Sequence, residues 1–164
     1  MALLIEPYID AIKTALEHET TGVNAQITAL NTLYAADAIT VESNKKIYCG
    51  RTFSVGQSTP AIVIWPDDMP AVEPTGAYTI NESPSIITWS IIVSRMSDEN
   101  ANRKLWRHML AVYRAVRNSY NLAGAVDICN YAGELFDSPW GTIEENVQVL
   151  VGGHRWSIQN EEEV

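Results

Sequence analysis

Hydrophobic residues recur at helical spacing in three parts of the chain. The repeats cover residues 3–18, about residues 22–34, and residues 97–118, where the apolar face spans roughly 100° or more. The sequence therefore predicts two helices at the start of the chain and one long helix after its middle, with Ser97 or Asp98 as the N-cap of the long helix. The repeating positions are Ile5, Ile9, Ile12 and Leu16; Val23, Ile27, Leu30 and Tyr34; and Leu105, Met109, Val112 and Val116, widened by Trp106, Leu110 and Tyr113.

Strand patterns lie between the second and third predicted helices. Residues 61–65, AIVIW, form a continuous apolar run between two prolines, which is typical of a buried strand. Residues 85–94 alternate between apolar and polar positions, which predicts a second strand. Residues 38–59 contain weak strands or an extended loop, and the proline-rich residues 66–76 are typical of an exposed loop at a sheet edge. The second strand is expected to place Ile87, Trp89, Ile91 and Val93 on one face, with Trp89 and Trp106 in the same interior.

Two further stretches predict strands after the long helix. Residues 121–124 are typical of a turn, and residues 126–136 indicate a strand with a bulge at Gly133. Residues 146–159 alternate on both sides of Gly152 and Gly153, which form either a hairpin turn or a bend in one long strand; we favour the bend. The order of elements predicts an α+β fold, in which a mainly antiparallel sheet carries one long helix and two N-terminal helices complete the domain.

The composition limits the classes of protein. The 164 residues fit a single domain over 1–164, with an acidic tail at about 160–164. A formal net charge of -9 argues against general binding to nucleic acid, because that binding depends on cations that neutralise phosphates. Cys49 and Cys129 lack the spacing of a zinc site or a disulfide framework. No apolar stretch approaches the ~20 residues that span a bilayer, and no signal-peptide pattern is present, so we expect an intracellular protein.

Patterns typical of catalysis are scarce. The stretch GQSTP at residues 56–60 begins like a nucleophile elbow, but Pro60 replaces the closing glycine and a strand follows where the motif needs a helix. We interpret His18 as a favourable contact at a helix C-terminus and His108 as a helix-surface residue, and His154 has no metal-binding partner in sequence. The sequence therefore predicts no catalytic residue, no cofactor and no metal site, and a protein that is not an enzyme.

The long helix carries most of the positive charge. Six of the eleven Lys and Arg residues lie between Arg95 and Arg117, and no acid occurs from residue 100 to residue 126. One interpretation is a solvated face tied to the acidic body by ion pairs; another is a docking face for an acidic neighbour, and nucleic acid is a third. In a closed ring, the basic helix of one subunit could meet the acidic loop of the next. The candidate interface residues are Arg103, Arg107, Arg114 and Arg117.

Three stretches together resemble a known family. They are the amphipathic opening helix LIEPYIDAIKTAL, the strand that passes into the long helix, TWSIIVSRMSDENANRKLWRHMLAVYRAVR, and the closing strands from ELFDSPW to VQVLVGGHRWSIQNEEE. In order and texture they are similar to the small tail-terminator and tail-completion proteins, or head-to-tail connector proteins, of long-tailed bacteriophages. The resemblance covers most of the chain and rests on the pattern of elements.

The resemblance implies a structural, non-enzymatic virion protein. It implies a homo-oligomeric ring, commonly of six subunits, that caps the tail tube and joins it to the head connector. The implied partners are further copies of the chain, the tail tube protein and a head-completion or neck protein; no membrane is involved, and assembly takes place in the host cytoplasm. DNA would pass through the ring without specific binding, and an acidic body fits this role because a lumen that bound phosphates tightly would hold the genome back.

Other interpretations stay open. Within the same class, the chain could be a head-completion, neck or tail-tube protein, since these occupy adjacent layers. From other classes, it could be a small intracellular hydrolase that uses Ser58 or a histidine, or a monomeric or dimeric binding module. The mass of the native particle separates a ring from a monomer.

Overall fold

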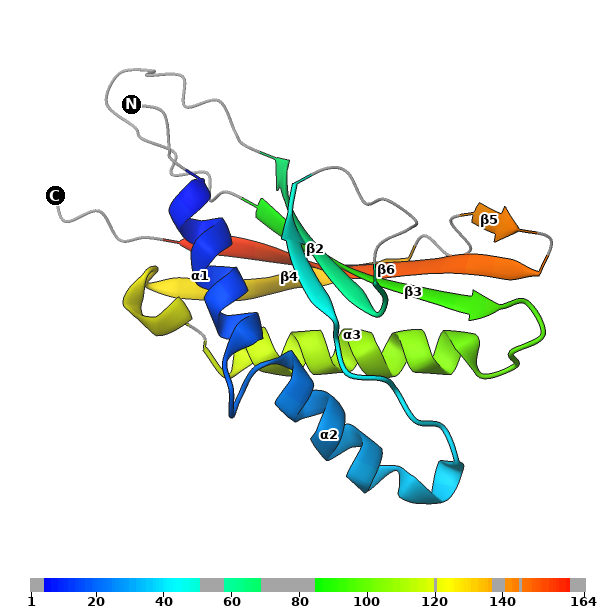
Figure 1. The fold of residues 1–164 in the computed structure, drawn as a ribbon. Helices are drawn as coiled ribbons and strands as arrows, with labels where there is room; N and C mark the ends of the chain where they lie inside the picture. Colours follow the sequence, from blue (N-terminus) through cyan, green and yellow to red (C-terminus); the bar gives the residue numbers. More distant parts are fainter. Residues whose placement is uncertain are drawn as a thin grey trace, which may run out of the picture.

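The computed structural model describes residues 5–50, 58–68, 85–119, 121–136, 141–144 and 146–159 (Figure 1). Residues 51–57 of the stretch predicted to contain weak strands or an extended loop, most of the proline-rich loop and the acidic tail lie outside these residues. The order of helices and strands agrees with the prediction from the sequence. The elements are α1 (Glu6–Glu17), α2 (Val23–Leu33), η1 (Ala35–Asp37), β1 (Lys46–Cys49), β2 (Ala61–Asp68), β3 (Ser85–Arg95), α3 (Ala101–Arg117), η2 (Leu122–Gly124), β4 (Ile128–Phe136), β5 (Gly141–Glu144) and β6 (Val147–Gln159).

The described strands form one sheet of six strands. The order is β1-β2-β3-β6-β4, and β5 pairs with β6. Strands β1 and β2 run parallel, whereas every other pair is antiparallel. Helices α1 and α3 contact the sheet, and α2 packs against α3 (Figure 1). The predicted α+β fold, with a mainly antiparallel sheet and one long helix packed on it, is therefore confirmed.

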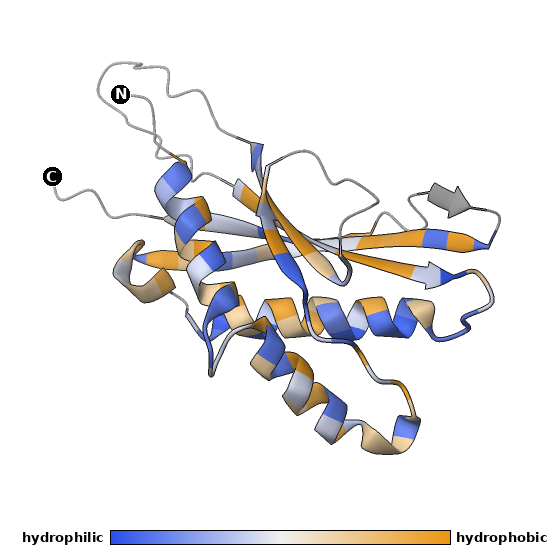
Figure 2. Ribbon diagram, viewed as in Figure 1, coloured by the Kyte–Doolittle hydropathy of each residue, from blue (hydrophilic) through white to orange (hydrophobic). Residues whose placement is uncertain are grey.

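The main hydrophobic core lies between the sheet and the helices. Four of the apolar positions predicted for α3 are buried, namely Leu105, Met109, Val112 and Val116, and so are Ile12 and Leu16 of α1 and Val23, Ile27 and Leu30 of α2. Trp156 of β6 is fully buried among them, and its indole nitrogen donates a hydrogen bond to Thr88 Oγ1 at 2.9 Å. Leu110 and Tyr113 are partly buried, and Trp106 is exposed. Hydrophobic and hydrophilic residues alternate along all three helices in Figure 2, as expected for helices that bury one face.

Trp89, Ile91 and Val93 share one face of β3, as predicted, but that face does not meet α3. Trp89 packs on the side of the sheet away from α3, with buried Val63, Ile91 and Val149, whereas Ile92 of the opposite face packs on α3. Trp106 is 54% exposed, so the two tryptophans do not share an interior. Alternation identified the strand correctly but could not tell which face meets the helix, because both faces of this central strand are buried.

Strand β6 runs without interruption through its two glycines. Its residues pair with β3 from Val147 to Ser157, so the expected single long strand is confirmed and the hairpin alternative is excluded. A Cβ atom on Gly152 would lie 2.5 Å from the Met109 sulfur, and one on Gly153 would lie 2.8 Å from Trp89 Cε3. The glycines therefore allow a side chain from each face to approach the strand closely.

Strand β4 contains the predicted bulge. Its pairing with β6 skips a residue between Tyr131 and Gly133, and Gly133 has a φ of 139°, which favours glycine. The extra residue changes which side chains face α3 in the second half of the strand. Tyr131 lies opposite Trp156 before the bulge, and Glu134 and Phe136 lie opposite His154 and Gly152 after it.

The start of α3 lies slightly later than predicted. Helix α3 follows Asn100, so neither Ser97 nor Asp98 is the N-cap. Asp98 instead holds the preceding turn: its carboxylate accepts hydrogen bonds from the Asn100 N–H at 3.0 Å and from Lys104 Nζ at 2.7 Å. The bond from Lys104 is the main cause that lowers the pKa of Asp98.

Candidate functional site

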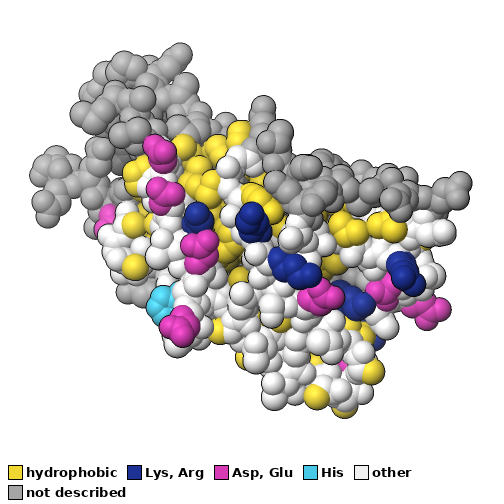
Figure 3. Space-filling view, viewed as in Figure 1, with side chains coloured by type: hydrophobic (Ala, Val, Ile, Leu, Met, Phe, Trp, Pro, Cys, Tyr) yellow, Lys and Arg dark blue, Asp and Glu magenta, His cyan; other side chains and the backbone are white. Residues whose placement is uncertain are grey.

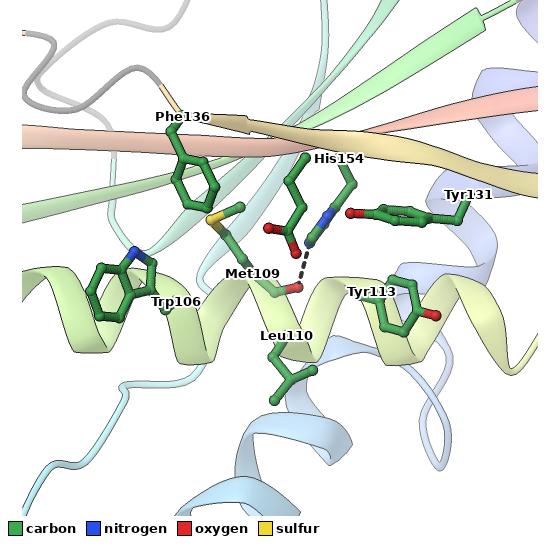
Figure 4. A pocket seen from close by; sticks show the side chains of 8 residues that line it. Trp106, Met109, Leu110, Tyr113, Tyr131, Phe136 and His154 are labelled. Atoms are coloured by element: carbon green, nitrogen blue, oxygen red, sulfur yellow. Dashed lines mark hydrogen bonds between the residues drawn. The ribbon is translucent and has the colours of Figure 1, made fainter.

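An open groove lies between α3 and β4. Its cavity volume is about 410 Å³. Trp106 and Phe136 stand at one end, 54% and 60% exposed, and Tyr113 and Tyr131 stand at the other (Figure 4). We call this site the α3–β4 groove; it is lined by Trp106, Met109, Leu110, Tyr113, Tyr131, Glu134, Phe136 and His154.

Two local features of the chain build the groove. Trp106, Leu110 and Tyr113 follow one another at intervals of four and three residues, so they form a continuous row along one side of α3. On the other wall, the bulge in β4 turns Glu134 and Phe136 toward α3. The groove therefore depends on the row of side chains along α3 and on the register shift in β4. The spacing of apolar residues in the sequence indicates the row but not how β4 faces it.

His154 forms the inner end of the groove. Its side chain is buried, and Nε2 donates a hydrogen bond to the Met109 carbonyl at 2.8 Å (Figure 4). Burial is the main cause that lowers the pKa of His154, which keeps the ring neutral. The hydrogen bond from His154 links β6 to α3. Because Nδ1 is also shielded from solvent, His154 is poorly placed to exchange protons with a bound molecule.

Aromatic rings surround His154. The Tyr113 and Tyr131 rings meet edge to face with centroids 5.1 Å apart, and both lie within 6 Å of the His154 ring. Trp156 stacks on Tyr113 at 6.1 Å. Burial, followed by the nearby Glu134 carboxylate, raises the pKa of Tyr131, so its hydroxyl stays protonated at neutral pH. The groove thus has a firmly packed aromatic end, whereas its other end is open.

His108 lies on the other side of α3 and is fully buried. The expectation of a helix-surface residue was wrong, because the segment after η1 crosses this side of the helix and places Asn44 Oδ1 3.2 Å from His108 Nε2. Burial lowers the pKa of His108 to about 4. A neutral, enclosed imidazole has a structural role here.

The same segment covers Arg107. Arg107 is only 9% exposed. Its guanidinium donates hydrogen bonds to the Ile39 carbonyl at 2.5 Å and to the Asp37 carboxylate at 2.7 Å, and it lies 4.7 Å from the centre of the Tyr34 ring. The expectation that Arg107 lies on a docking face is therefore wrong. Its contacts with distant residues of the chain make it a structural cation.

The other three candidate arginines lie nearer to solvent. Arg103 is 3.7 Å from Asp37 and is half exposed. Arg114 is partly buried and Arg117 is exposed, and neither forms an ion pair within the part of the chain that the structure describes. On the face drawn in Figure 3, Lys and Arg side chains are interspersed with Asp and Glu side chains. Of the four candidate arginines, Arg114 and Arg117 are therefore the two without an acidic partner among the described residues.

The remaining residues considered for catalysis or metal binding do not lie together in the described structure. Ser58 is exposed ahead of β2, and among the described residues no hydrogen bond joins it to a histidine. His18 follows the last residue of α1, as expected, with Nδ1 2.9 Å from Thr21 Oγ1. Cys49 and Cys129 are both free thiols, the first exposed and the second buried. Within the described ranges, no group of three His, Cys, Asp or Glu side chains is placed to hold a metal ion.

Comparison of the chain with protein-family models and with curated protein sequences gives no match. None of the helices described here is both long and apolar enough to cross a membrane. Among the described residues, the α3–β4 groove combines a cavity with large exposed aromatic side chains.

Proposed function

We propose that the protein is a structural subunit of a bacteriophage tail that assembles into a homo-oligomeric ring, commonly of six copies, as a tail terminator or tail-completion protein. The ring would cap the tail tube and join it to the head connector. One observation carries the proposal: a groove with exposed aromatic side chains, which no described residue covers, lies beside β4, and the described strands place β4 at an edge of the sheet.

The groove exposes side chains that a monomer usually buries. Trp106 and Phe136 each expose more than half of their surface, and they lie at the same end of one cavity. Contiguous apolar surface rimmed by polar residues is typical of sites that bind another protein. Tryptophan, tyrosine and arginine are also the residues that most often dominate binding energy at interfaces.

A ring would explain why a subunit exposes aromatic residues on one side, because that side would contact the next subunit. A heterologous contact joins two different patches of the same chain, and it repeats until the circle closes. The order of helices and strands supports the bacteriophage assignment, since it is the order on which the resemblance rests. A net charge of -9 suits a channel through which DNA slides, because an acidic wall does not retain phosphates. The protein would then reside in the tail or neck of the virion.

A second candidate is a binding module that acts as a monomer or dimer. The same groove favours it, because exposed aromatic residues around a cavity suit the side chains of a bound peptide. Particle mass separates the two candidates. The binding module predicts one or two chains per particle, whereas the tail protein predicts a ring.

The test measures particle mass and tube binding. Native mass spectrometry and negative-stain microscopy of the full chain, alone and with tail tubes, should detect a ring. Trp106→Ala combined with Phe136→Ala should leave the circular dichroism spectrum unchanged and abolish the ring. Leu33→Ala is the matched control, since Leu33 is 64% exposed at the end of α2, on another surface. A chain that stays monomeric and also fails to bind tail tubes would contradict the proposal.

A further inference from the structure

The α3–β4 groove contains an acidic group without a cationic partner. Glu134 is the one charged side chain among the described residues that line the groove. It is exposed, it shares a hydrogen bond with the Tyr131 side chain, and none of the ion pairs among the described residues includes it. The groove therefore presents a carboxylate to whatever molecule enters it.

The rings around Glu134 suit a positively charged occupant. Trp106 and Phe136 are 54% and 60% exposed at one end of the cavity, and Tyr113 and Tyr131 lie at the other end (Figure 4). Aromatic faces attract ammonium and guanidinium groups, and a nearby carboxylate adds direct charge attraction. A lysine can use both features, because its carbon stem packs on apolar surface while its ammonium group reaches an acid. The groove therefore fits a basic side chain.

A hollow lined by lysines lies at the opposite edge of the sheet. Strands β1 and β4 are the two ends of the order β1-β2-β3-β6-β4. Beside β1, a hollow of about 580 Å³ is lined by residues that include Lys13, Lys45 and Lys46. Lys13 lies 4.0 Å from Glu17, and Lys45 lies 3.3 Å from Glu42, so each of these two lysines has an acidic neighbour.

Lys46 is the lysine of this hollow that has no ion pair among the described residues. It is exposed at the first residue of β1, and its ammonium group lies 5.7 Å from the centre of the Tyr48 ring of the same strand. Glu19 also lines the hollow but forms no ion pair with Lys46. Neighbouring strands are about 4.8 Å apart, so β1 and β4 are about 19 Å apart and Lys46 does not reach Glu134 of its own copy.

We propose that Lys46 of one copy binds in the α3–β4 groove of the next copy, where its ammonium group pairs with Glu134 and its stem packs on the aromatic rings. The inference rests on the ring of the proposed function and identifies the two surfaces that meet. Because these surfaces lie at opposite edges of one sheet, each copy offers a groove to one neighbour and a lysine to the other. Such a contact is head-to-tail and repeats around a circle.

Charge reversal tests the pair. Glu134→Lys brings two cations together at every contact, and Lys46→Glu brings two acids together. Each variant should raise the protein concentration needed for half-maximal ring formation by about tenfold or more, most strongly at low salt. A chain that carries both substitutions should assemble as the wild type does, because the two charges are exchanged. Single variants that assemble normally would overturn the inference, and so would a double variant that does not regain assembly.

A matched control separates the pair from net charge. Glu99→Lys changes the net charge by the same amount as Glu134→Lys, but Glu99 is exposed in the turn before α3 and does not line the groove. It should leave assembly unchanged. Circular dichroism should show that all variants are folded, since each substituted side chain is exposed. An equal loss of assembly in Glu99→Lys would overturn the inference.

A mixture of the two single variants gives a second readout. When the copies alternate, each Glu134→Lys copy has a Lys46→Glu copy on both sides, and every contact again joins opposite charges. Native mass spectrometry of an equimolar mixture should therefore detect rings with equal numbers of the two variants. A mixture that forms no more rings than the separate samples would overturn the inference.

Carbodiimide cross-linking locates the contact directly. The reagent joins a lysine amine to a carboxylate that touches it. A mixture of isotopically labelled and unlabelled wild-type chains should give a peptide pair that links Lys46 of one copy to Glu134 of another. Glu134→Gln should remove this pair. Rings that yield no such pair would overturn the inference.

The two proposals fail in different ways. Rings that persist in both single variants would overturn the contact between Lys46 and Glu134 and leave the ring function standing. A wild-type chain that forms no ring and binds no tail tube would overturn the tail function. A cross-link between Lys46 and Glu134 of two copies in a smaller particle would then still support the contact.

Discussion

The two sides of α3 differ in how far the rest of the chain covers them. On one side, Arg107 and His108 are covered by the segment after η1, which supplies Asp37, the Ile39 carbonyl and Asn44 as partners. On the side toward β4, no described segment covers Trp106 in this way, and Trp106 is 54% exposed. Polar residues that looked available for binding are thus enclosed, whereas apolar residues that looked like core are open. We infer that the second side is completed by another molecule.

The largest expected effect separates Leu105 from its neighbour Trp106. Leu105 is fully buried against the sheet, so Leu105→Ala should lower the free energy of unfolding by roughly 2 to 5 kcal/mol. Trp106→Ala should change it by about 0.5 kcal/mol or less, because the ring already contacts solvent. Urea denaturation of both variants checks the comparison. Similar midpoints would show that Trp106 belongs to the core of the subunit.

The pH dependence of stability tests the covered side of α3. Burial lowers the pKa of His108 to about 4, below its unfolded value of about 6.5. Between these values the unfolded chain binds a proton that the folded chain does not, so stability should fall as pH falls from 6.5 to 4, by up to about 3 kcal/mol. Stability measured over this range should lose much of its slope in His108→Gln. An equal slope in both proteins would contradict the buried, neutral state.

Arg107 should matter more for folding than the other arginines. Arg107→Ala leaves the buried Ile39 carbonyl without its donor and removes the partner of Asp37, which should cost about 1 to 3 kcal/mol. Asp37 is partly exposed, so solvent moderates the loss. Arg114→Ala should cost about 0.5 kcal/mol or less. Thermal melts of the two variants measure the difference, and equal losses would show that the two sides are not distinct.

Comparison of the sequence predictions with the structure shows what residue spacing can predict. Spacing predicted the three helices, the long strand β6, the bulge at Gly133 and the buried face of α3, because each depends on local periodicity or on glycine. It misplaced Arg107 and His108, because their partners are more than sixty residues away in sequence.

The groove itself had one signal in the sequence. The row of Trp106, Leu110 and Tyr113 makes the apolar face of α3 wider than the sheet alone covers. The path of β4 after its bulge decides whether this row of side chains is covered or open. This path is a long-range property that no spacing encodes.

The smallest expected effect on folding concerns Arg114 and Arg117. Reversal of Arg114 and Arg117 to Glu should change the free energy of unfolding by less than about 1 kcal/mol, because neither has an ion pair in the described part of the molecule. It should nevertheless weaken assembly, most strongly at low ionic strength, where charge attraction is least screened.

Arg103→Glu is the matched control for this reversal. Arg103 lies on the same helix and already has an acidic neighbour in Asp37, so its reversal should affect assembly less. Circular dichroism and particle mass across a salt series should be measured on the same samples. A folded double variant that assembles normally at low salt would show that the open side of α3 binds through its aromatic residues and not through Arg114 and Arg117. A double variant that unfolds would show instead that the arginines complete the subunit itself, as Arg107 does on the covered side.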